Sequence, residues 1–175
     1  MKDNPVEQEV AMLLLSAKMT IAVAESCTGG LICHRLTNIS GSSDYLDRGV
    51  VSYSNRSKIE LLGVSAKVIR EHGAVSEACV RAMATGIKRL AGTDLGLAVS
   101  GIAGPTGGTP EKPVGTVYMA LAWDEDVECL KYLFEGSRGE IKEKASEQAL
   151  LRIRDHLKLH YSAIRDPRSQ IKKHG

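Results

Sequence analysis

The amino-acid sequence predicts a three-layer α/β/α fold, in which helices cover both faces of a mostly parallel mixed sheet. Short apolar runs alternate with amphipathic segments along most of the 175-residue chain, which is the pattern of strands joined by helices. The last two apolar runs, 114–123 and 127–134, are separated only by acidic residues and predict a hairpin. This hairpin would add an antiparallel member to the sheet.

The first half of the chain predicts helices and strands in alternation. An opening helix is expected from Pro5 to Met19, because apolar residues recur at helical spacing and proline fits a first turn. A buried strand over 21–24, a helix from Thr28 to Asn38 and a strand over 46–53 follow. Two short helices, 57–62 and 65–72, are each expected to end at a glycine, which readily closes a helix.

The second half predicts a longer amphipathic helix from Ser76 to Leu90 and a buried strand over 94–100. A loop rich in glycine and proline separates that strand from the hairpin, and a long helix over 140–159 closes the domain. Because no linker is evident, we expect a single domain over residues 1–165 and a disordered polar tail over 166–175.

The composition limits the kinds of partner. With 43% hydrophobic and 25% charged residues, the chain resembles a soluble globular protein. A net charge of +2 and 4% aromatic residues argue against a nucleic-acid partner. Four cysteines without a CxxC pair indicate reduced thiols in a cytoplasmic protein. No secretion signal or membrane span is evident, so we expect no membrane partner.

The turn after the first strand carries the first chemical motif, Glu-Ser-Cys-Thr-Gly-Gly at 25–30. N–H groups at the start of the next helix would stabilise a phosphate or an oxyanion beside a hydroxyl group. Ser26 is therefore the candidate nucleophile, and the turn residues after it are candidates for oxyanion and substrate binding: Cys27, Thr28, Gly29 and Gly30. Alternatively, Ser26 or Thr28 only caps the helix and the glycines permit a tight turn. A nucleophilic Cys27 is a further alternative, although a small packing residue fits it better.

The second motif, residues 48–58, places a phenol, an amide and an ammonium group near the end of the second strand. A lysine acts as a base where burial or a neighbouring cation lowers its pKa, and serine–lysine pairs serve several unrelated amidases. Lys58 is thus predicted to deprotonate Ser26, with Tyr53 assisting proton transfer or donating to the leaving group. The alternative makes Tyr53 an ordinary strand residue and Lys58 a solvated charge.

The third motif is the glycine-rich loop after the 94–100 strand, from Ser100 to Gly108. Gly101, Ala103 and Gly104 are candidates to bind a phosphate or a carbonyl oxygen through the backbone, although such a loop can also be only a flexible turn. The spacing matches neither a Walker loop nor a dinucleotide-binding motif. Since all three motifs begin at strand ends, we expect one cleft to collect them.

Metal chemistry has weaker support in the sequence. His156 and His160 lie four residues apart on the last predicted helix, but no further ligands complete a site. We therefore expect a surface histidine pair and no catalytic metal.

In combination, the motifs resemble the CinA C-terminal domain family. The segments that carry the resemblance are, in order, residues 24–30, 41–43, 48–55, 101–105 and 112–117. The resemblance implies a three-layer α/β/α fold with a mixed sheet. It also implies a nicotinamide-nucleotide amidohydrolase, also called PncC, which converts nicotinamide mononucleotide to nicotinic acid mononucleotide and ammonia.

By the same resemblance, Ser26 corresponds to the family's proposed nucleophile, and Tyr53 and Lys58 match its Tyr-Ser-Asn-x-x-Lys segment. The predicted substrate-binding set is completed by Ser42, Arg48, Asn55 and Arg138, the last of these for the substrate phosphate. The chain departs from similar proteins at two positions. Ser137 and Lys142 stand where those proteins usually carry an aspartate and an arginine.

Two other functions are compatible with parts of the sequence. One is a catalytically silent nucleotide-binding or regulatory module. The other, a tyrosine–lysine oxidoreductase, is disfavoured because Tyr53 and Lys58 are five residues apart and the dinucleotide glycine motif is missing. For the amidohydrolase we expect a small pyridine nucleotide as partner, no cofactor, and a homodimer.

Overall fold

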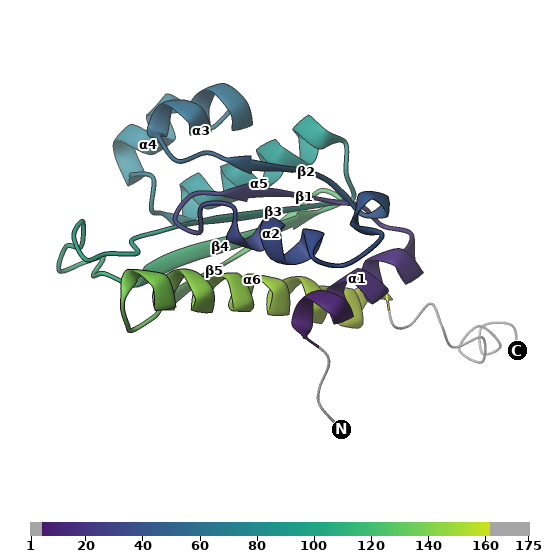
Figure 1. Ribbon diagram of the computed structural model, residues 1–175. Helices are drawn as coiled ribbons and strands as arrows, with labels where there is room; N and C mark the ends of the chain where they lie inside the picture. Colours follow the sequence, from purple (N-terminus) through teal and green to yellow (C-terminus); the bar gives the residue numbers. More distant parts are fainter. Residues whose placement is uncertain (1–4, 162–175) are drawn as a thin grey trace, which may run out of the picture.

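The computed structural model describes residues 5–161, which form the predicted three layers (Figure 1). Every predicted helix and strand is present, with bounds that differ from the expected ones by a few residues. The predicted tail, 166–175, lies outside the described residues. In chain order the elements are α1 (Val6–Ala17), β1 (Ile21–Glu25), α2 (Leu31–Thr37), the short 3₁₀ helix η1 (Ser42–Asp44), β2 (Leu46–Val51), α3 (Asn55–Leu62), α4 (Ala66–His72), α5 (Glu77–Ala91), β3 (Leu95–Gly101), β4 (Thr116–Trp123), β5 (Asp126–Leu133) and α6 (Arg138–Tyr161).

The five strands form one sheet in the order β2-β1-β3-β4-β5. β1 is parallel to both β2 and β3, whereas β4 is antiparallel to both β3 and β5. Only β4 therefore runs against the other strands, which confirms the mostly parallel mixed sheet. At the carboxyl end of β1, Glu25 is in register with Val51 of β2 and Val99 of β3, so the segments that follow these strands leave the sheet side by side.

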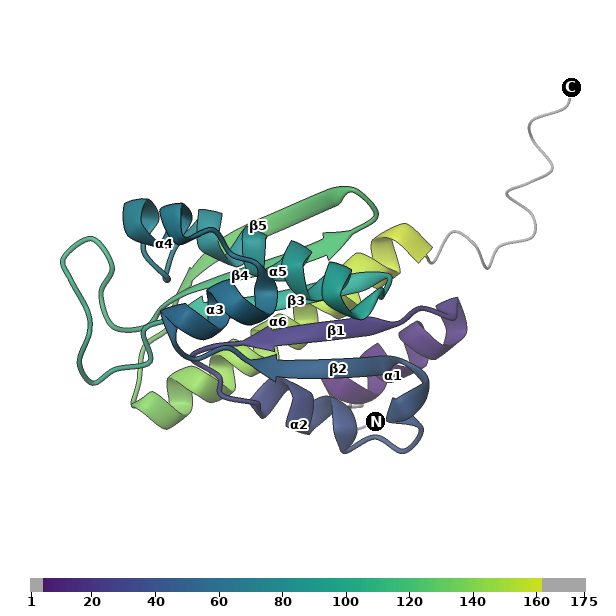
Figure 2. The same cartoon turned by 90° about the horizontal axis from the view of Figure 1, so that it is seen from above.

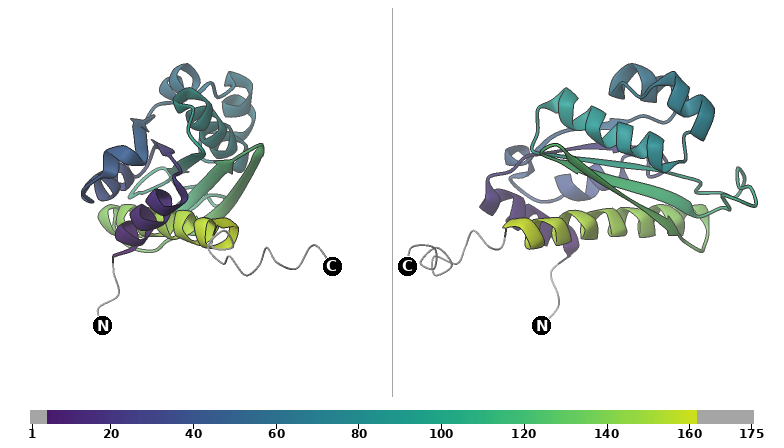
Figure 3. Two further views of the ribbon diagram at one scale, coloured as in Figure 1. Left: turned by 90° about the vertical axis from the view of Figure 1, so that its right-hand side faces the viewer. Right: turned by 180° about the vertical axis from the view of Figure 1, so that it is seen from behind.

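The sheet separates two apolar cores, one against each helical layer (Figure 3). Side chains on alternate strand positions point to opposite faces. In β1, Ile21 and Val23 pack toward α1, α2 and α6, whereas Ala22 and Ala24 pack toward α3 and α5. Large aliphatic residues thus fill the first core, and small residues let α5 approach the second face closely.

Two glycines permit this close approach of α5. A Cβ atom on Gly96 of β3 would lie 2.4 Å from the carbonyl oxygen of Ala84 in α5. On Gly86 of α5, a Cβ atom would lie 2.0 Å from the carbonyl oxygen of Leu62, the last residue of α3. Because any larger residue would push these backbones apart, α5 fixes the position of α3 relative to the sheet.

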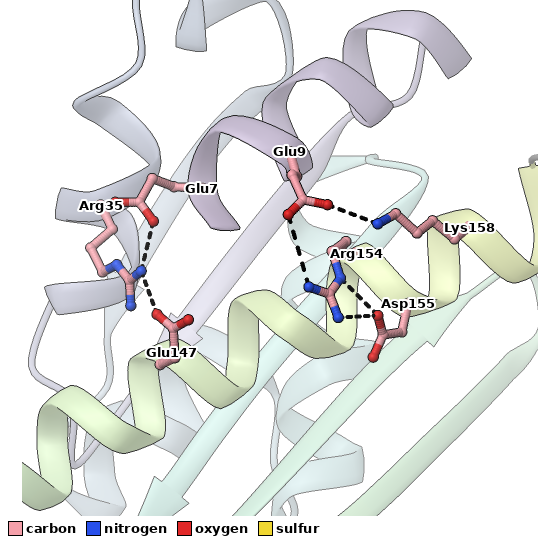
Figure 4. A network of polar contacts seen from close by, with 7 residues as sticks. All are labelled: Glu7, Glu9, Arg35, Glu147, Arg154, Asp155 and Lys158. Atoms are coloured by element: carbon pink, nitrogen blue, oxygen red, sulfur yellow. Dashed lines mark hydrogen bonds and ion pairs between the residues drawn. The ribbon is translucent and has the colours of Figure 1, made fainter. Parts of the chain in front are cut away.

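Ion pairs tie α1 and α2 to α6 on the other face of the sheet (Figure 4). Nη2 of Arg35 in α2 lies 2.6 Å from carboxylate oxygens of both Glu7 in α1 and Glu147 in α6. A second set joins α1 to the end of α6 through Glu9, Arg154 and Lys158. Such partly exposed pairs contribute at most about 1 kcal/mol each, so the apolar contacts beneath them dominate the packing.

The helices of the described range include no membrane-spanning candidate. Although α6 has 24 residues, none of the helices within residues 5–161 is apolar over the length that a bilayer requires.

Candidate active site

A cavity of about 270 Å³ lies at the carboxyl ends of β1, β2 and β3, a size at the lower end for small-molecule sites. In Figure 2 the loop between β3 and β4 and the first turn of α6 lie at this end of the sheet. All three predicted motifs therefore contribute to one pocket, as expected for ligand sites in such sheets. The residues that line it are Ser26, Cys27, Tyr53, Lys58, Ala74, Val75, Ser100, Gly101, Ile102, Ala103, Gly104, Thr106, Gly107 and Arg138.

Ser26 and Lys58 are in direct contact at the base of the pocket. The Lys58 amine nitrogen lies 2.9 Å from the Ser26 hydroxyl oxygen, and Lys58 is 1% exposed. The same nitrogen lies 2.6 Å from the carbonyl oxygen of Ser52 and 3.4 Å from that of Tyr53. Lys58 is therefore not the solvated charge that the alternative interpretation required.

Burial lowers the pKa of the Lys58 ammonium group below its ordinary value. Lys58 makes no ion pair with any residue between 5 and 161, so no carboxylate offsets this effect there. In the structure the Lys58 nitrogen donates to the Ser26 hydroxyl and to the Ser52 and Tyr53 carbonyls. Once the group has lost one proton, two N–H groups can still donate to the carbonyls, and the lone pair can accept the Ser26 proton.

The start of α3 puts Lys58 in place. Ser54 caps this helix, because its hydroxyl accepts the Ser57 N–H while the Ser57 hydroxyl accepts the Ser54 N–H. This capping box starts the helix at Asn55 and places Lys58 in the first turn, facing the end of β1. There the positive end of the helix dipole further disfavours an ammonium group.

Glu25, directly before Ser26, is a buried residue that the sequence analysis did not assign to the site. Its carboxylate accepts the N–H groups of Gly30, Ile32 and Cys33 at 2.9, 3.1 and 2.9 Å. The N–H groups at the start of α2 thus already have an acceptor in the Glu25 carboxylate. The prediction that this helix end binds an external anion is wrong. An acidic residue that ends an apolar strand just before a glycine-closed helix start was the available sequence signal.

Two of the oxyanion donors predicted in this turn are already bound to other acceptors. The N–H of Gly29 donates to the Ser26 carbonyl at 3.2 Å, and that of Gly30 is bound to Glu25. Within residues 5–161, the N–H groups of Cys27 and Thr28 meet no oxygen acceptor. Of these two residues only Cys27 lines the pocket with Ser26, so its N–H is the donor still available beside the Ser26 hydroxyl.

The remaining alternatives for this turn do not hold. Gly30 occupies the N-cap position of α2 without any side-chain cap, so neither Ser26 nor Thr28 is a capping residue. Burial raises the pKa of the Cys27 thiol to about 12, which keeps it protonated near neutral pH. Cys27 therefore serves as a small packing residue.

Arg138, at the start of α6, reaches across the pocket opening. Its Nη1 donates to the carbonyl oxygen of Gly104 at 2.7 Å, and its Nη2 donates to the phenol oxygen of Tyr53 at 2.7 Å. Tyr53 is 59% exposed. Its backbone carbonyl contacts Lys58, but its phenol group contacts Arg138. The predicted proton-transfer role of Tyr53 has no corresponding side-chain contact.

The glycine-rich loop leaves β3 beside β4, where only glycine fits. A Cβ atom on Gly101 would lie 2.7 Å from the carbonyl oxygen of Thr116. The next residue donates its N–H to that same oxygen at 2.9 Å. Gly101, Ala103 and Gly104 consequently line the pocket as predicted.

Six other predicted binding residues do not line the pocket. Ser42 lies in η1, before β2, and thus at the opposite end of the sheet. Arg48 lies within edge strand β2, in register with Ala22, and pairs with Asp47. Both predictions are wrong for this pocket, because closeness in sequence to Tyr53 does not bring the amino end of a strand to its carboxyl end. The others belong to the adjoining turns without reaching the cavity: Thr28, Gly29, Gly30 and Asn55.

Ser137 and Lys142, where the chain departs from similar proteins, lie directly before α6 and in its first turns. Ser137 and Glu140 form a capping box, since the Glu140 carboxylate accepts the Ser137 N–H at 2.8 Å and the Ser137 hydroxyl accepts the Glu140 N–H at 3.4 Å. Serine and aspartate are both strong N-cap residues, so Ser137 preserves the start of α6. The Lys142 amine lies 3.6 Å from where a Cβ atom of Gly29 would be, which brings a cation close to the Ser26 turn.

The prediction of a surface histidine pair is wrong for His156. His156 is 8% exposed and packs on Trp123, with the ring centroids 4.5 Å apart. Burial lowers its pKa to about 4. No group of three or more His, Cys, Asp and Glu side chains within residues 5–161 is arranged to hold a metal ion.

A larger hollow of about 700 Å³ lies between α2 and α6, but it contains none of the predicted site residues. The predicted catalytic residues Ser26, Tyr53 and Lys58 line the smaller cavity at the strand ends, which we therefore take as the candidate active site.

The fold and the pocket together define an α/β/α domain with a serine–lysine pair at the ends of its parallel strands. Residues 3–157 match the family model of the CinA C-terminal domain, and the chain belongs to this family. The resemblance found in the sequence is confirmed.

Relatives with curated names are considerably longer than this chain. A CinA-like protein of Syntrophus aciditrophicus is 55% identical over 156 residues, which cover 89% of this chain and 37% of that protein. A CinA-like protein of Thermotoga maritima is 46% identical over 156 residues, which cover 89% of this chain and 38% of that protein. The chain thus spans little more than a third of the length of these relatives.

Solved structures share the whole domain. Competence damage-inducible protein A of Klebsiella pneumoniae is 38% identical with a TM-score of 0.86, over 89% of this chain and 96% of that one. The competence/damage inducible protein CihA of Agrobacterium tumefaciens is 34% identical with a TM-score of 0.82, over 90% and 98%. These similarities confirm the predicted fold class.

Proposed function

We propose that the chain is a nicotinamide-nucleotide amidohydrolase that converts nicotinamide mononucleotide to nicotinic acid mononucleotide and ammonia. The observation that carries the proposal is the 2.9 Å contact between the Ser26 hydroxyl and the buried Lys58 amine. A hydroxyl held against a lysine whose pKa is lowered is the arrangement that serine–lysine amidases use.

In the first half of the reaction, the neutral Lys58 amine accepts the Ser26 proton as the oxygen attacks the carboxamide carbon. The carbonyl π bond opens, and the N–H group of Cys27 donates to the resulting oxyanion. As the tetrahedral intermediate collapses, the C–N bond breaks and Lys58 returns the proton to the departing nitrogen. The products are ammonia and a nicotinoyl ester on Ser26.

In the second half, Lys58 removes a proton from a water molecule that attacks the ester carbon. Collapse of the second intermediate breaks the bond to the Ser26 oxygen, which recovers its proton from Lys58. The carboxylic acid product loses its proton to solvent and leaves as the carboxylate. Neither half of the proposed reaction uses a metal ion or a cofactor.

Recognition of the nucleotide depends on the cations around the pocket. Arg138 lines the pocket and makes no ion pair within residues 5–161, so its charge is available to the substrate phosphate. Family membership supports the proposal, although the names of the relatives describe competence or CinA likeness and no substrate.

The test is a product assay on nicotinamide mononucleotide, with and without a chelator. We expect equal release of ammonia and nicotinic acid mononucleotide under both conditions. Loss of activity with the chelator would contradict the metal-free mechanism.

The alternative is a silent nucleotide-binding or regulatory module. Calorimetry on the same preparation separates the two, because a module would bind the mononucleotide and release no ammonia. Turnover that disappears in Ser26→Ala would instead support the enzyme.

A further inference from the structure

The phenol oxygen of Tyr53 accepts a hydrogen bond from the Arg138 guanidinium group at 2.7 Å. The Ser26 hydroxyl meets the Lys58 amine directly, so proton exchange between them needs no intermediary. Lys58 is nearly inaccessible, whereas more than half of the Tyr53 surface is exposed at the rim of the pocket. The tyrosine hydroxyl thus belongs to the pocket opening and not to the reacting pair.

Arg138 differs from several other arginines of the chain in having no carboxylate partner within residues 5–161. Arg35, Arg81 and Arg152 each pair with glutamate side chains. Arg138 instead donates to two neutral oxygens, the Tyr53 phenol and the Gly104 carbonyl. These contacts orient the guanidinium group and leave its charge uncompensated at the pocket.

A guanidinium group carries five N–H donors in a planar fork. Two of these are used by Tyr53 and Gly104, so the others can bind an anion without breaking either contact. Since an arginine side chain otherwise has many rotamers, fixing it beforehand reduces the entropy lost when an anion binds.

We propose that Tyr53 is a specificity-determining residue, which holds Arg138 against the glycine-rich loop so that the guanidinium group binds the phosphate of a mononucleotide. The proposal rests on the proposed function for the identity of the ligand. It assigns Tyr53 to recognition of the phosphate and leaves proton transfer to Lys58 alone.

The test compares Tyr53→Phe with the wild-type chain on nicotinamide mononucleotide and on nicotinamide riboside, which lacks the phosphate. Tyr53→Phe removes the hydrogen bond that orients the Arg138 guanidinium group, and a hydrogen bond to a charged group changes an equilibrium constant by about tenfold or more. We expect KM for the mononucleotide to rise by about tenfold while kcat changes by less than about twofold. For the riboside, the change in KM should be several times smaller. Tyr118→Phe, on β4 outside the pocket, is the matched control.

Arg138→Gln and the double variant complete the test. If Tyr53 acts through Arg138, the double variant should bind the mononucleotide as weakly as Arg138→Gln alone, because the two effects are not additive. Binding is measured by calorimetry in a Ser26→Ala background, where turnover does not interfere.

The outcomes separate this inference from the proposed function. Suppose that the wild-type chain releases ammonia, but Tyr53→Phe lowers only kcat or raises KM equally for the mononucleotide and the riboside. This result overturns the role of Tyr53 and leaves the amidohydrolase intact. Suppose instead that the chain binds the mononucleotide through its phosphate and that this binding weakens in Tyr53→Phe, but the wild-type chain releases no ammonia. This result supports the role of Tyr53 and overturns the amidohydrolase. Absence of mononucleotide binding overturns both.

Discussion

The Ser26 hydroxyl oxygen and the Lys58 amine nitrogen lie 2.9 Å apart although 32 positions separate them in the sequence. Parallel pairing of β1 with β2 brings the two segments together, because Glu25 is in register with Val51. The N–H of Ser52 then donates to the Glu25 carbonyl at 2.8 Å, which continues the pairing beyond β2. The candidate catalytic pair is thus a direct consequence of sheet register.

The buried amine predicts how activity depends on pH. Because Lys58 must be neutral to accept a proton, kcat/KM should rise with pH through the lowered pKa of Lys58. The midpoint of this rise should lie below about 10.4, the ordinary value for lysine. A profile of ammonia release from about pH 6 to about pH 11, which extends past the ordinary lysine pKa, tests this. Activity that stays flat at lower pH and rises only at the ordinary lysine pKa would contradict the assignment.

Lys58→Met should reduce ammonia release by about a thousandfold or more. The matched control is Lys67→Met on α4, where the replaced side chain is 70% exposed. We expect the control to retain wild-type kinetics.

Glu25 should be required for an active turn because its carboxylate accepts three backbone N–H groups. In Glu25→Gln, the side-chain NH₂ cannot accept these bonds, and leaving a buried donor unpaired costs about 1–3 kcal/mol. Chemical denaturation should report this loss in the free energy of unfolding, together with slower ammonia release. Glu60→Gln, in an exposed ion pair on α3, is the control, and an equal loss there would refute the buried cap.

Gly86 should control the position of Lys58 through α3. A methyl group at this position would meet the Leu62 carbonyl at 2.0 Å, so α5 and α3 must separate in Gly86→Ala. We expect a loss of about 1–3 kcal/mol in unfolding free energy, and a lower kcat because α3 carries Lys58. Gly139→Ala provides the comparison, since nothing lies within 4 Å of its added methyl group. If both variants behave alike, the backbone contact is unimportant.

Ser137 should stabilise the start of α6 despite its departure from similar proteins. Ser137→Ala removes the side-chain partner of the Glu140 N–H and carboxylate, and loss of an N-cap lowers Tm by about 2–4 °C in a domain of this size. Ser137→Thr keeps a capping hydroxyl and should recover most of the loss. Differential scanning calorimetry measures both variants. An unchanged Tm in Ser137→Ala would show that the cap contributes little.

The fold was largely predictable because its signals are local. Apolar runs marked the strands, and glycines marked the ends of several helices, such as Gly63 after α3. The hairpin correctly predicted an antiparallel member, β4. The burial of His156 was missed, since a histidine four residues from another does not indicate that Trp123 will cover it.

The site was predictable where motifs follow the carboxyl ends of parallel strands. Ser26, Lys58 and the glycine-rich loop meet for this reason. Ser42 and Arg48 do not reach the pocket, because they precede or lie within β2. The cap by Glu25 and the partner of the Tyr53 phenol depend on side-chain positions that spacing alone does not specify.

The most direct test of the account is ammonia release from nicotinamide mononucleotide by Ser26→Ala, measured beside calorimetric binding of the same ligand. Removing the nucleophile should lower the rate by at least about a thousandfold while the mononucleotide still binds. A variant that binds the mononucleotide and releases ammonia at nearly the wild-type rate would contradict the central claim that Ser26, deprotonated by Lys58, attacks the amide.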